Sequence, residues 1–276
     1  MPSLRGIRPV SRLVYAYPSL PDRLHSKLSR VPAVFSALVV HGAINLALVD
    51  ALELLNRLLL SHNDEAHIDA TRIKQFLRIK SQCYRVLQDQ DLPAFEIQLC
   101  IAIICLCMQL TPRYQHQSND PSDQETLGAL ASAFINAKLS GAKQSQAHTH
   151  ALIWCSLVIG SFLLLQPMTH RYLRAQGHIV LVIAARKLLP ESAMREWTYI
   201  ENSLTRLPCN EALRRTWRQA WESVMERHRV WLAMGLMAVG VPFSGVGEKG
   251  ASVLKDVDDE IEYLLLRAGR ESLPDI

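Results

Sequence analysis

The chain of 276 residues has few aromatic residues, at 7%, and only 12 glycines. It also lacks any run of alternating apolar and polar residues long enough to predict a strand. Hydrophobic residues make up 49% and charged residues 20%, a balance that excludes a disordered chain. Abundant Leu, Ala, Arg and Gln favour helices, and the length is sufficient for a large core. Composition therefore predicts an all-α protein.

Most motifs that carry enzyme chemistry are missing as well. Neither the phosphate-binding pattern GxxxxGK[ST], nor HExxH of zinc peptidases, nor GxSxG of serine hydrolases occurs. Gly245-Val-Gly247 with Lys249 predicts only a flexible turn. These absences favour a protein that is not an enzyme and that has no cofactor.

Cysteine pairs of the type CxxC, which structural zinc sites use, are also absent. Five of the six cysteines lie in apolar helical stretches, where a thiol packs like a small hydrophobe. No apolar run like that of a secretory signal follows Met1, so we expect reduced thiols in a cytosolic or nuclear compartment. The predicted free thiols are Cys83, Cys100, Cys105, Cys107, Cys155 and Cys209.

The run from Ala151 to Pro167, ALIWCSLVIGSFLLLQP, contains no charged residue and no polar face of any width. A helix that is apolar on every side must be buried on every side, so other elements have to surround it. Its apolar stretch of about 15 residues is shorter than the ~20 that cross a bilayer, and Pro167 ends it. We therefore predict a fully buried central helix and no membrane span.

Further helices are predicted on both sides of this run from apolar residues at three- and four-residue spacing. The first is a single long amphipathic helix, and Asn210 is the expected N-cap of a helix rich in tryptophan. We expect these helices to pack in antiparallel hairpins. Besides the central helix, the predicted helices cover residues 32–63, 69–86, 94–110, 127–139, 169–189, 192–208, 210–231 and 252–268.

The charge and proline pattern divides the chain into two parts. Residues 1–30 carry four prolines and predict an irregular basic segment, whereas residues 31–276 form the all-α domain. The polar stretch 111–124 marks a sub-boundary within this domain, and residues 140–150 form a second polar connection. The basic residues of the first segment are Arg5, Arg8, Arg12, Arg23, Lys27 and Arg30.

Several short pieces between the central run and the tryptophan-rich helix share a pattern of apolar residues, an Arg-aromatic pair and tryptophans. They are Ala151-Leu-Ile-Trp154, Val158-Ile-Gly160, His170-Arg-Tyr-Leu173, Glu196-Trp197 with Ile200 and Leu204, Leu207-Pro-Cys209, and Trp217. Together they resemble the regulatory domain of fungal-specific transcription factors. The order Glu-Trp is reversed relative to the family pattern, and Leu-Pro stands where the family often has Leu-Trp.

The resemblance implies an all-α regulatory domain in the nucleus. It would act through proteins of the transcription machinery, through a DNA-binding subunit, or through a small effector, and a homodimer or heterodimer is compatible with it. It carries over no catalytic residue, cofactor or metal. In the family, six clustered cysteines bind two zinc ions in an N-terminal DNA-binding module, and this chain has no such cluster. No sequence-specific DNA contact is therefore expected from this chain.

An alternative function comes from an acidic tract near the C-terminus. Asp258, Asp259 and Glu262 fit the letters DDxxE, with which all-α terpene cyclases bind magnesium and a diphosphate. The second motif of those enzymes should follow the tract, but the stretch 202–209 that approximates it precedes the tract. Cys209 also stands where that motif needs a carboxylate. The alternative is an all-α, magnesium-dependent enzyme acting on a diphosphate.

Histidines and tryptophans offer two weaker candidates for a functional site, a metal site and a ligand cavity. His148 and His150 could face one metal ion only in a strand, and their polar context predicts a solvated connection instead. The tryptophan-rich helix has an apolar stripe that could line a ligand cavity, but aromatic residues at helical spacing are usually core. This stripe consists of Leu213, Trp217, Trp221, Val224, His228 and Trp231.

Overall fold

In the computed structural model the chain folds into packed helices, in agreement with the predicted all-α class. The structure describes residues 22–60, 70–88, 92–111, 128–134, 145–166, 170–190 and 196–238, with side chains given except at 22–24 and 229–238. Within these ranges no residue lies in a strand. The predicted loop 240–250 and the predicted helix 252–268 lie outside the described residues, and so does most of the predicted sub-boundary 111–124.

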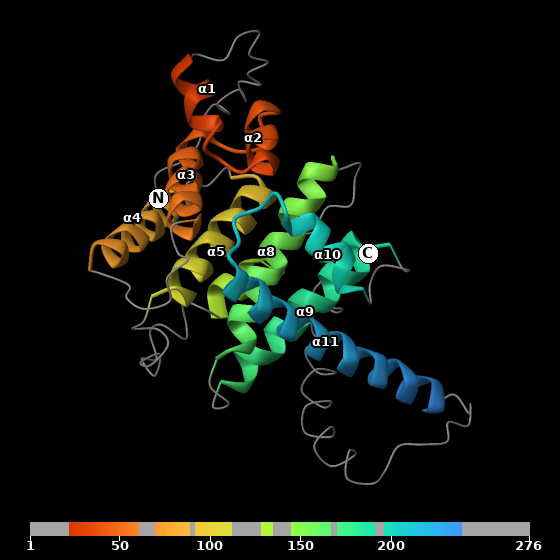
Figure 1. The fold of residues 1–276 in the computed structure, drawn as a ribbon. Helices are drawn as coiled ribbons and strands as arrows, with labels where there is room; N and C mark the ends of the chain where they lie inside the picture. Colours follow the sequence, from red (N-terminus) through yellow and green to blue (C-terminus); the bar gives the residue numbers. More distant parts are fainter. Residues whose placement is uncertain are drawn as a thin grey trace, which may run out of the picture.

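Two apolar helices, α5 (Ala94–Gln109) and α8 (Gln146–Leu164), pack against each other at the centre of the fold (Figure 1). Every residue of α8 from Ala151 to Leu163 is buried. Besides α5, this helix contacts α2 (Ala33–Val40), α9 (Arg171–Leu188), α10 (Trp197–Leu204) and α11 (Glu211–Ala238). The predicted central buried helix is therefore confirmed.

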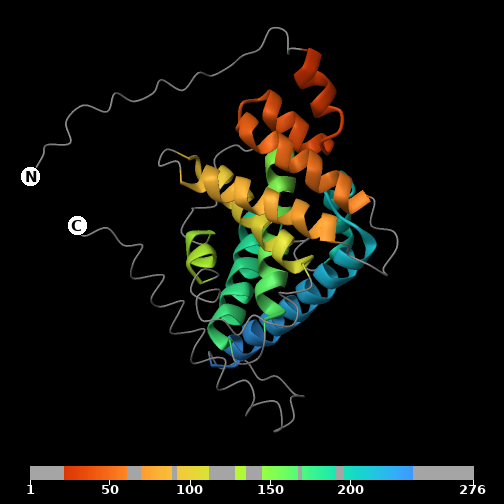
Figure 2. The ribbon, with the colours of Figure 1, turned by 90° about the vertical axis from the view of Figure 1, so that its left-hand side faces the viewer.

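The remaining helices lie around this pair. α1 (Asp22–Leu28), α2 and α3 (Val49–Leu60) lie at one end of it, and the C-terminal part of α11 lies at the other (Figure 2). α4 (Ala70–Leu87) packs on α5 and α3. Buried residues from Leu28 in α1 to Val224 in α11 belong to one continuous apolar core.

α8 and α9 form an antiparallel hairpin whose crossing depends on two glycines. Gly160 lies against Leu181, whereas Gly177 lies against Leu163 and Leu164. The later residue of α8 thus contacts the earlier residue of α9, so the two helices run in opposite directions. A Cβ atom at Gly160 would lie 2.5 Å from Leu181 Cγ, and one at Gly177 would lie 2.8 Å from the Gly160 oxygen. Gly160 and Gly177 thus allow α8 and α9 to approach each other more closely than any larger residue at these positions would.

The long helix predicted over residues 32–63 is wrong. The chain forms α2, leaves the helix at His41, and resumes in the 3-10 helix η1 (Leu46–Leu48) followed by α3. Gly42 has a φ of 69°, and the N–H groups of Gly42 and Ala43 donate to Val39 and Leu38 oxygens, the pattern of a Schellman C-cap. The Asn45 side chain then caps η1 by accepting from the Ala47 N–H.

Two other boundaries also differ from prediction. Residues 1–30 were predicted to be irregular, but they contain the helix α1. Its last residue, Leu28, is buried, and Lys27 forms an ion pair with Asp50 of α3. α8 begins at Gln146, inside the predicted polar connection 140–150, because the Ser145 hydroxyl accepts from the His148 N–H and caps it. The other predicted helices agree with α4, α5, α9, α10 and α11 apart from their ends, and residues 128–134 are helical.

With 19 residues, α8 is longer than its apolar run alone, and among the described helices it is the one long and apolar enough to cross a membrane. In this fold 72% of its most apolar window is buried among other helices. Burial of α8 among other helices of the chain thus explains why this helix is so apolar. The absence of a membrane span stays a prediction.

Candidate functional site

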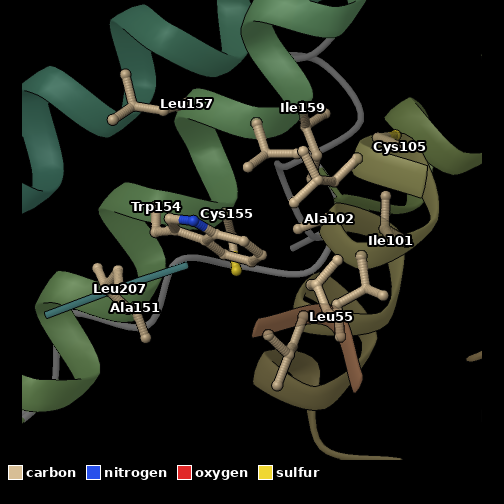
Figure 3. Packing of buried hydrophobic residues seen from close by; sticks show 14 of the residues in the cluster. Leu55, Ile101, Ala102, Cys105, Ala151, Trp154, Cys155, Leu157, Ile159 and Leu207 are labelled. Atoms are coloured by element: carbon tan, nitrogen blue, oxygen red, sulfur yellow. The ribbon is translucent and has the colours of Figure 1, made fainter. Parts of the chain in front are cut away.

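Two of the pieces that carry the family resemblance, residues 151–154 and 207–209, meet where α8 contacts the connection between α10 and α11. Trp154 of α8 is fully buried, and its indole Nε1 donates to the Pro208 oxygen in the connection between α10 and α11, at 2.9 Å. Its ring packs edge-to-face on Phe35 of α2, with centroids 5.5 Å apart. Figure 3 shows Trp154 extending from α8 toward Ala102, with Leu207 on the opposite side. One side chain therefore joins segments that are far apart in the sequence.

Three further tryptophans lie in the same region. Trp197 begins α10, while Trp217 and Trp221 lie one turn apart on α11, and all three are buried. Most of the predicted stripe is therefore core, whereas His228 is only half-buried and the side chain of Trp231 lies outside the described residues. The indole N–H groups of Trp197, Trp217 and Trp221 have no hydrogen-bond acceptor among the described residues.

The predicted free thiols are confirmed for all six cysteines. Those of α4, α5 and α8 are buried, and only Cys209, after α10, is half-buried. A hydrogen bond with Cys100, followed by burial, raises the pKa of Cys83, and burial raises the pKa of Cys105 to about 12. Burial also raises the pKa of Cys209 to about 11. These thiols are held in the protonated, unreactive form.

The side chains of His148 and His150 do not face a common metal ion. Both lie in the first turns of α8, where residues two apart point in different directions. His148 packs on Phe95, with ring centroids 4.2 Å apart, and burial lowers its pKa. Burial and then Arg206 lower the pKa of His150. Across the described ranges, no group of three or more His, Cys, Asp or Glu side chains could hold a metal ion.

The acidic tract of the alternative hypothesis, Asp258, Asp259 and Glu262, lies outside the described residues. Its approximate partner, stretch 202–209, forms the end of α10 and the connection to α11. That connection is occupied by packing, since Leu207 is buried and Pro208 accepts the bond from Trp154. The diphosphate enzyme therefore stays a prediction that the described residues leave untested.

Sequence reasoning missed a pair of arginine–imidazole contacts between α9 and α11. Arg227 Nη1 lies 3.3 Å from His178 Nε2, and Arg186 Nη2 lies 3.4 Å from His228 Nε2. A guanidinium only donates, so each imidazole accepts through an unprotonated Nε2 and is neutral. We call these four residues the α9–α11 seam.

The electrostatics of the seam are dominated by positive charge. Burial, then Arg227 and Arg174, lowers the pKa of His178 to about 4. Burial and then Arg186 lower the pKa of His228. α9 contains three arginines, one lysine and no carboxylate, a signal visible in its sequence RYLRAQGHIVLVIAARKL. The pairing of specific side chains across two helices was not visible there.

Comparison of the chain with models of protein families, with curated proteins and with solved structures finds no match. The resemblance to fungal-specific transcription factors thus depends on the quoted residues alone.

Proposed function

We propose that this chain is a non-enzymatic, all-α regulatory domain that acts in the nucleus through protein partners, like the regulatory domain of fungal-specific transcription factors. The observation that carries the proposal is the hydrogen bond from Trp154 to the Pro208 oxygen. It brings together the first and a late piece of the resemblance, which are 54 residues apart in the chain. The pieces belong to one packed unit, as a domain-level resemblance requires.

The intermediate pieces support the proposal because each occupies a defined packing position. Gly160 permits the close crossing of α8 and α9, and Leu173 is buried on α9. Trp197 starts α10, Trp217 is fully buried on α11, and the pieces from both helices pack on α8. Residues with such roles would be retained to keep a helical domain folded, whereas a catalytic site would need convergent polar side chains.

A small effector is the second route by which such a domain could be controlled. The contacts that we expect for such an effector are the indole N–H groups of Trp197, Trp217 and Trp221, which have no acceptor among the described residues. A ligand that carries carbonyl or carboxylate oxygens would satisfy them.

Tethering tests the proposal directly. The full chain is fused to a heterologous DNA-binding module in a fungal reporter strain, and reporter output and the location of a fluorescent fusion are measured. We expect nuclear accumulation and a change in transcription relative to the module alone. The matched control carries Gly160→Leu, which cannot fit against Leu181 and should not fold. Reporter output equal to that of the module alone, from a folded chain, would contradict the proposal.

A further inference from the structure

The α9–α11 seam presents two exposed guanidinium groups in fixed positions. Arg186 and Arg227 are exposed, yet each contacts a half-buried imidazole on the opposite helix. Long cationic side chains on a surface normally lose rotamer entropy when they bind an anion. Because these two are already held by His228 and His178, part of that cost is removed before binding.

The two arginines of the seam, Arg186 and Arg227, have no carboxylate as an ion-pair partner in the part of the chain that the structure describes. The charged groups that act on His178 are Arg227 from α11 and Arg174 from α9, and Arg186 is the one that acts on His228. α8, which packs on another face of α9, has no charged residue. Each guanidinium has five N–H donors, so most of them remain for an incoming anion.

We propose that the α9–α11 seam binds an acidic polypeptide segment of a protein partner, with Arg186 and Arg227 as the two anchors for its carboxylates. This inference rests on the proposed function, in which the domain acts through proteins. Arginine suits the role because its planar group pairs with a carboxylate through two parallel hydrogen bonds. His178 and Arg186 lie eight residues apart on α9, whereas Arg227 and His228 are neighbours on α11, so both anchors lie at the crossing of the two helices.

The distribution of charge favours a polypeptide over a nucleic acid. α11 carries the exposed carboxylates Glu222 and Glu226 close to the seam in sequence. A duplex presents one negative charge about every 1.7 Å along its axis and would meet these carboxylates as well as the arginines. An acidic peptide can place its few carboxylates on the arginines alone.

The experiment uses the full chain and a fluorescein-labelled helical peptide whose glutamates recur every three to four residues. Fluorescence anisotropy at physiological salt measures the Kd for the chain and for Arg186→Gln/Arg227→Gln. We expect the Kd to rise at least about tenfold, because each charge-assisted pair contributes more than a neutral hydrogen bond. The control, Lys187→Gln/Arg215→Gln, removes the same charge from exposed positions on the same helices and should change the Kd less than about twofold.

Histidine titration by NMR gives a second readout that a general charge effect would not produce. A bound carboxylate favours the protonated imidazole, so peptide binding should raise the pKa of both His178 and His228. An unchanged pKa at both positions, with the peptide bound, would overturn the assignment of the anchors.

Other outcomes also overturn the inference. Equal weakening by both double variants, or equal binding of a peptide with glutamine in place of glutamate, would show that no specific carboxylate site exists. Tighter binding of a short DNA duplex, lost in Arg186→Gln/Arg227→Gln, would assign the seam to nucleic acid. If peptide binding fails while the tethered chain still alters the reporter, only the seam assignment falls and the proposed function stands.

Discussion

The central pair α5–α8 and the peripheral pair α9–α11 are built on opposite principles. α8 has no charged residue and is buried over 13 consecutive positions, so its neighbours contact it on every side. α9 has four basic residues and buries a narrower face, formed mainly by small and branched side chains. α11 likewise buries the spaced residues Leu213, Trp217, Trp221 and Val224. The first pair supplies the core, and the second supplies the surface chemistry.

The difference shows where each region can be altered. Substitutions in the central pair act through volume, because close-packed interiors cannot adapt to added or removed atoms. Substitutions on the exposed faces of the peripheral pair act through charge and protonation, because these polar groups lie near solvent. The face of α9 that packs on α8 follows the rule for the central pair. The following predictions test this division, and a large effect in the wrong region would break it.

The largest effect is expected at Trp154. Trp154→Ala should lower the free energy of unfolding by about 3–5 kcal/mol, because it leaves a large cavity and removes the hydrogen bond to Pro208. Urea denaturation followed by circular dichroism measures this change in the free energy of unfolding. The control is Tyr199→Ala on the exposed face of α10, where the ring is 37% exposed and a change below about 0.5 kcal/mol is expected. Similar losses at the two positions would refute the central role of Trp154.

Added volume at the α8–α9 crossing should be the next most damaging change. Gly160→Ala and Gly177→Ala should each lower the free energy of unfolding by about 1–3 kcal/mol, since the new Cβ overlaps Leu181 or the Gly160 oxygen. Gly128→Ala is the matched control, because its Cβ would meet neighbours at an ordinary 3.8 Å. There the helix-favouring alanine should leave stability unchanged or raise it by up to about 1 kcal/mol. A neutral result at Gly177 would mean that the helices can separate without cost.

The same division explains what the sequence could predict. α8 was recognisable because an uncharged, uniformly apolar run has only one stable environment in a packed fold. The break at Gly42 was missed because apolar residues on both sides, such as Leu38 and Leu52, keep the same helical spacing. Two local signals were present, the glycine able to adopt a positive φ and the Asn45 cap, and they prevailed over periodicity.

The candidate site was predictable only in part. Trp154, Trp197 and Trp217 were singled out from the sequence as parts of the family resemblance, and the structure buries all three. The α9–α11 seam was not, because its contacts join residues 49 and 42 positions apart on helices whose crossing the sequence does not specify. His228 had been assigned to an apolar stripe by its position, yet its ring nitrogen contacts Arg186 at the surface.

Acidification should affect the peripheral pair through His178. Burial and the nearby arginines lower the pKa of His178 to about 4 in the folded chain, whereas its pKa in the unfolded chain is 6.5. The neutral imidazole therefore contributes fully to the free energy of unfolding above pH 6.5, and this contribution is lost as the pH falls toward 4. Between pH 8 and pH 5 this residue should account for a loss on the order of 2 kcal/mol. Urea denaturation at both pH values should show a smaller loss for His178→Gln, which keeps an acceptor for Arg227. His41→Gln, at an exposed imidazole outside the seam, is the control, and an unchanged pH dependence in His178→Gln would contradict the assignment.

Thiol alkylation compares the two regions without altering stability. Five buried cysteines belong to α4, α5 and α8, whereas the half-buried Cys209 lies beside α11. Iodoacetamide at pH 8 followed by mass spectrometry should modify Cys209 first and the others only after unfolding, because the reactive species is the thiolate. With its pKa raised to about 11, even Cys209 should react on the order of 100-fold more slowly than in urea, where the pKa returns to its ordinary range.

Faster labelling of Cys105 or Cys155 than of Cys209 would show that the central helices open locally before the periphery does. The central pair would then not be the most stable part of the fold, and the comparison would have to be reversed.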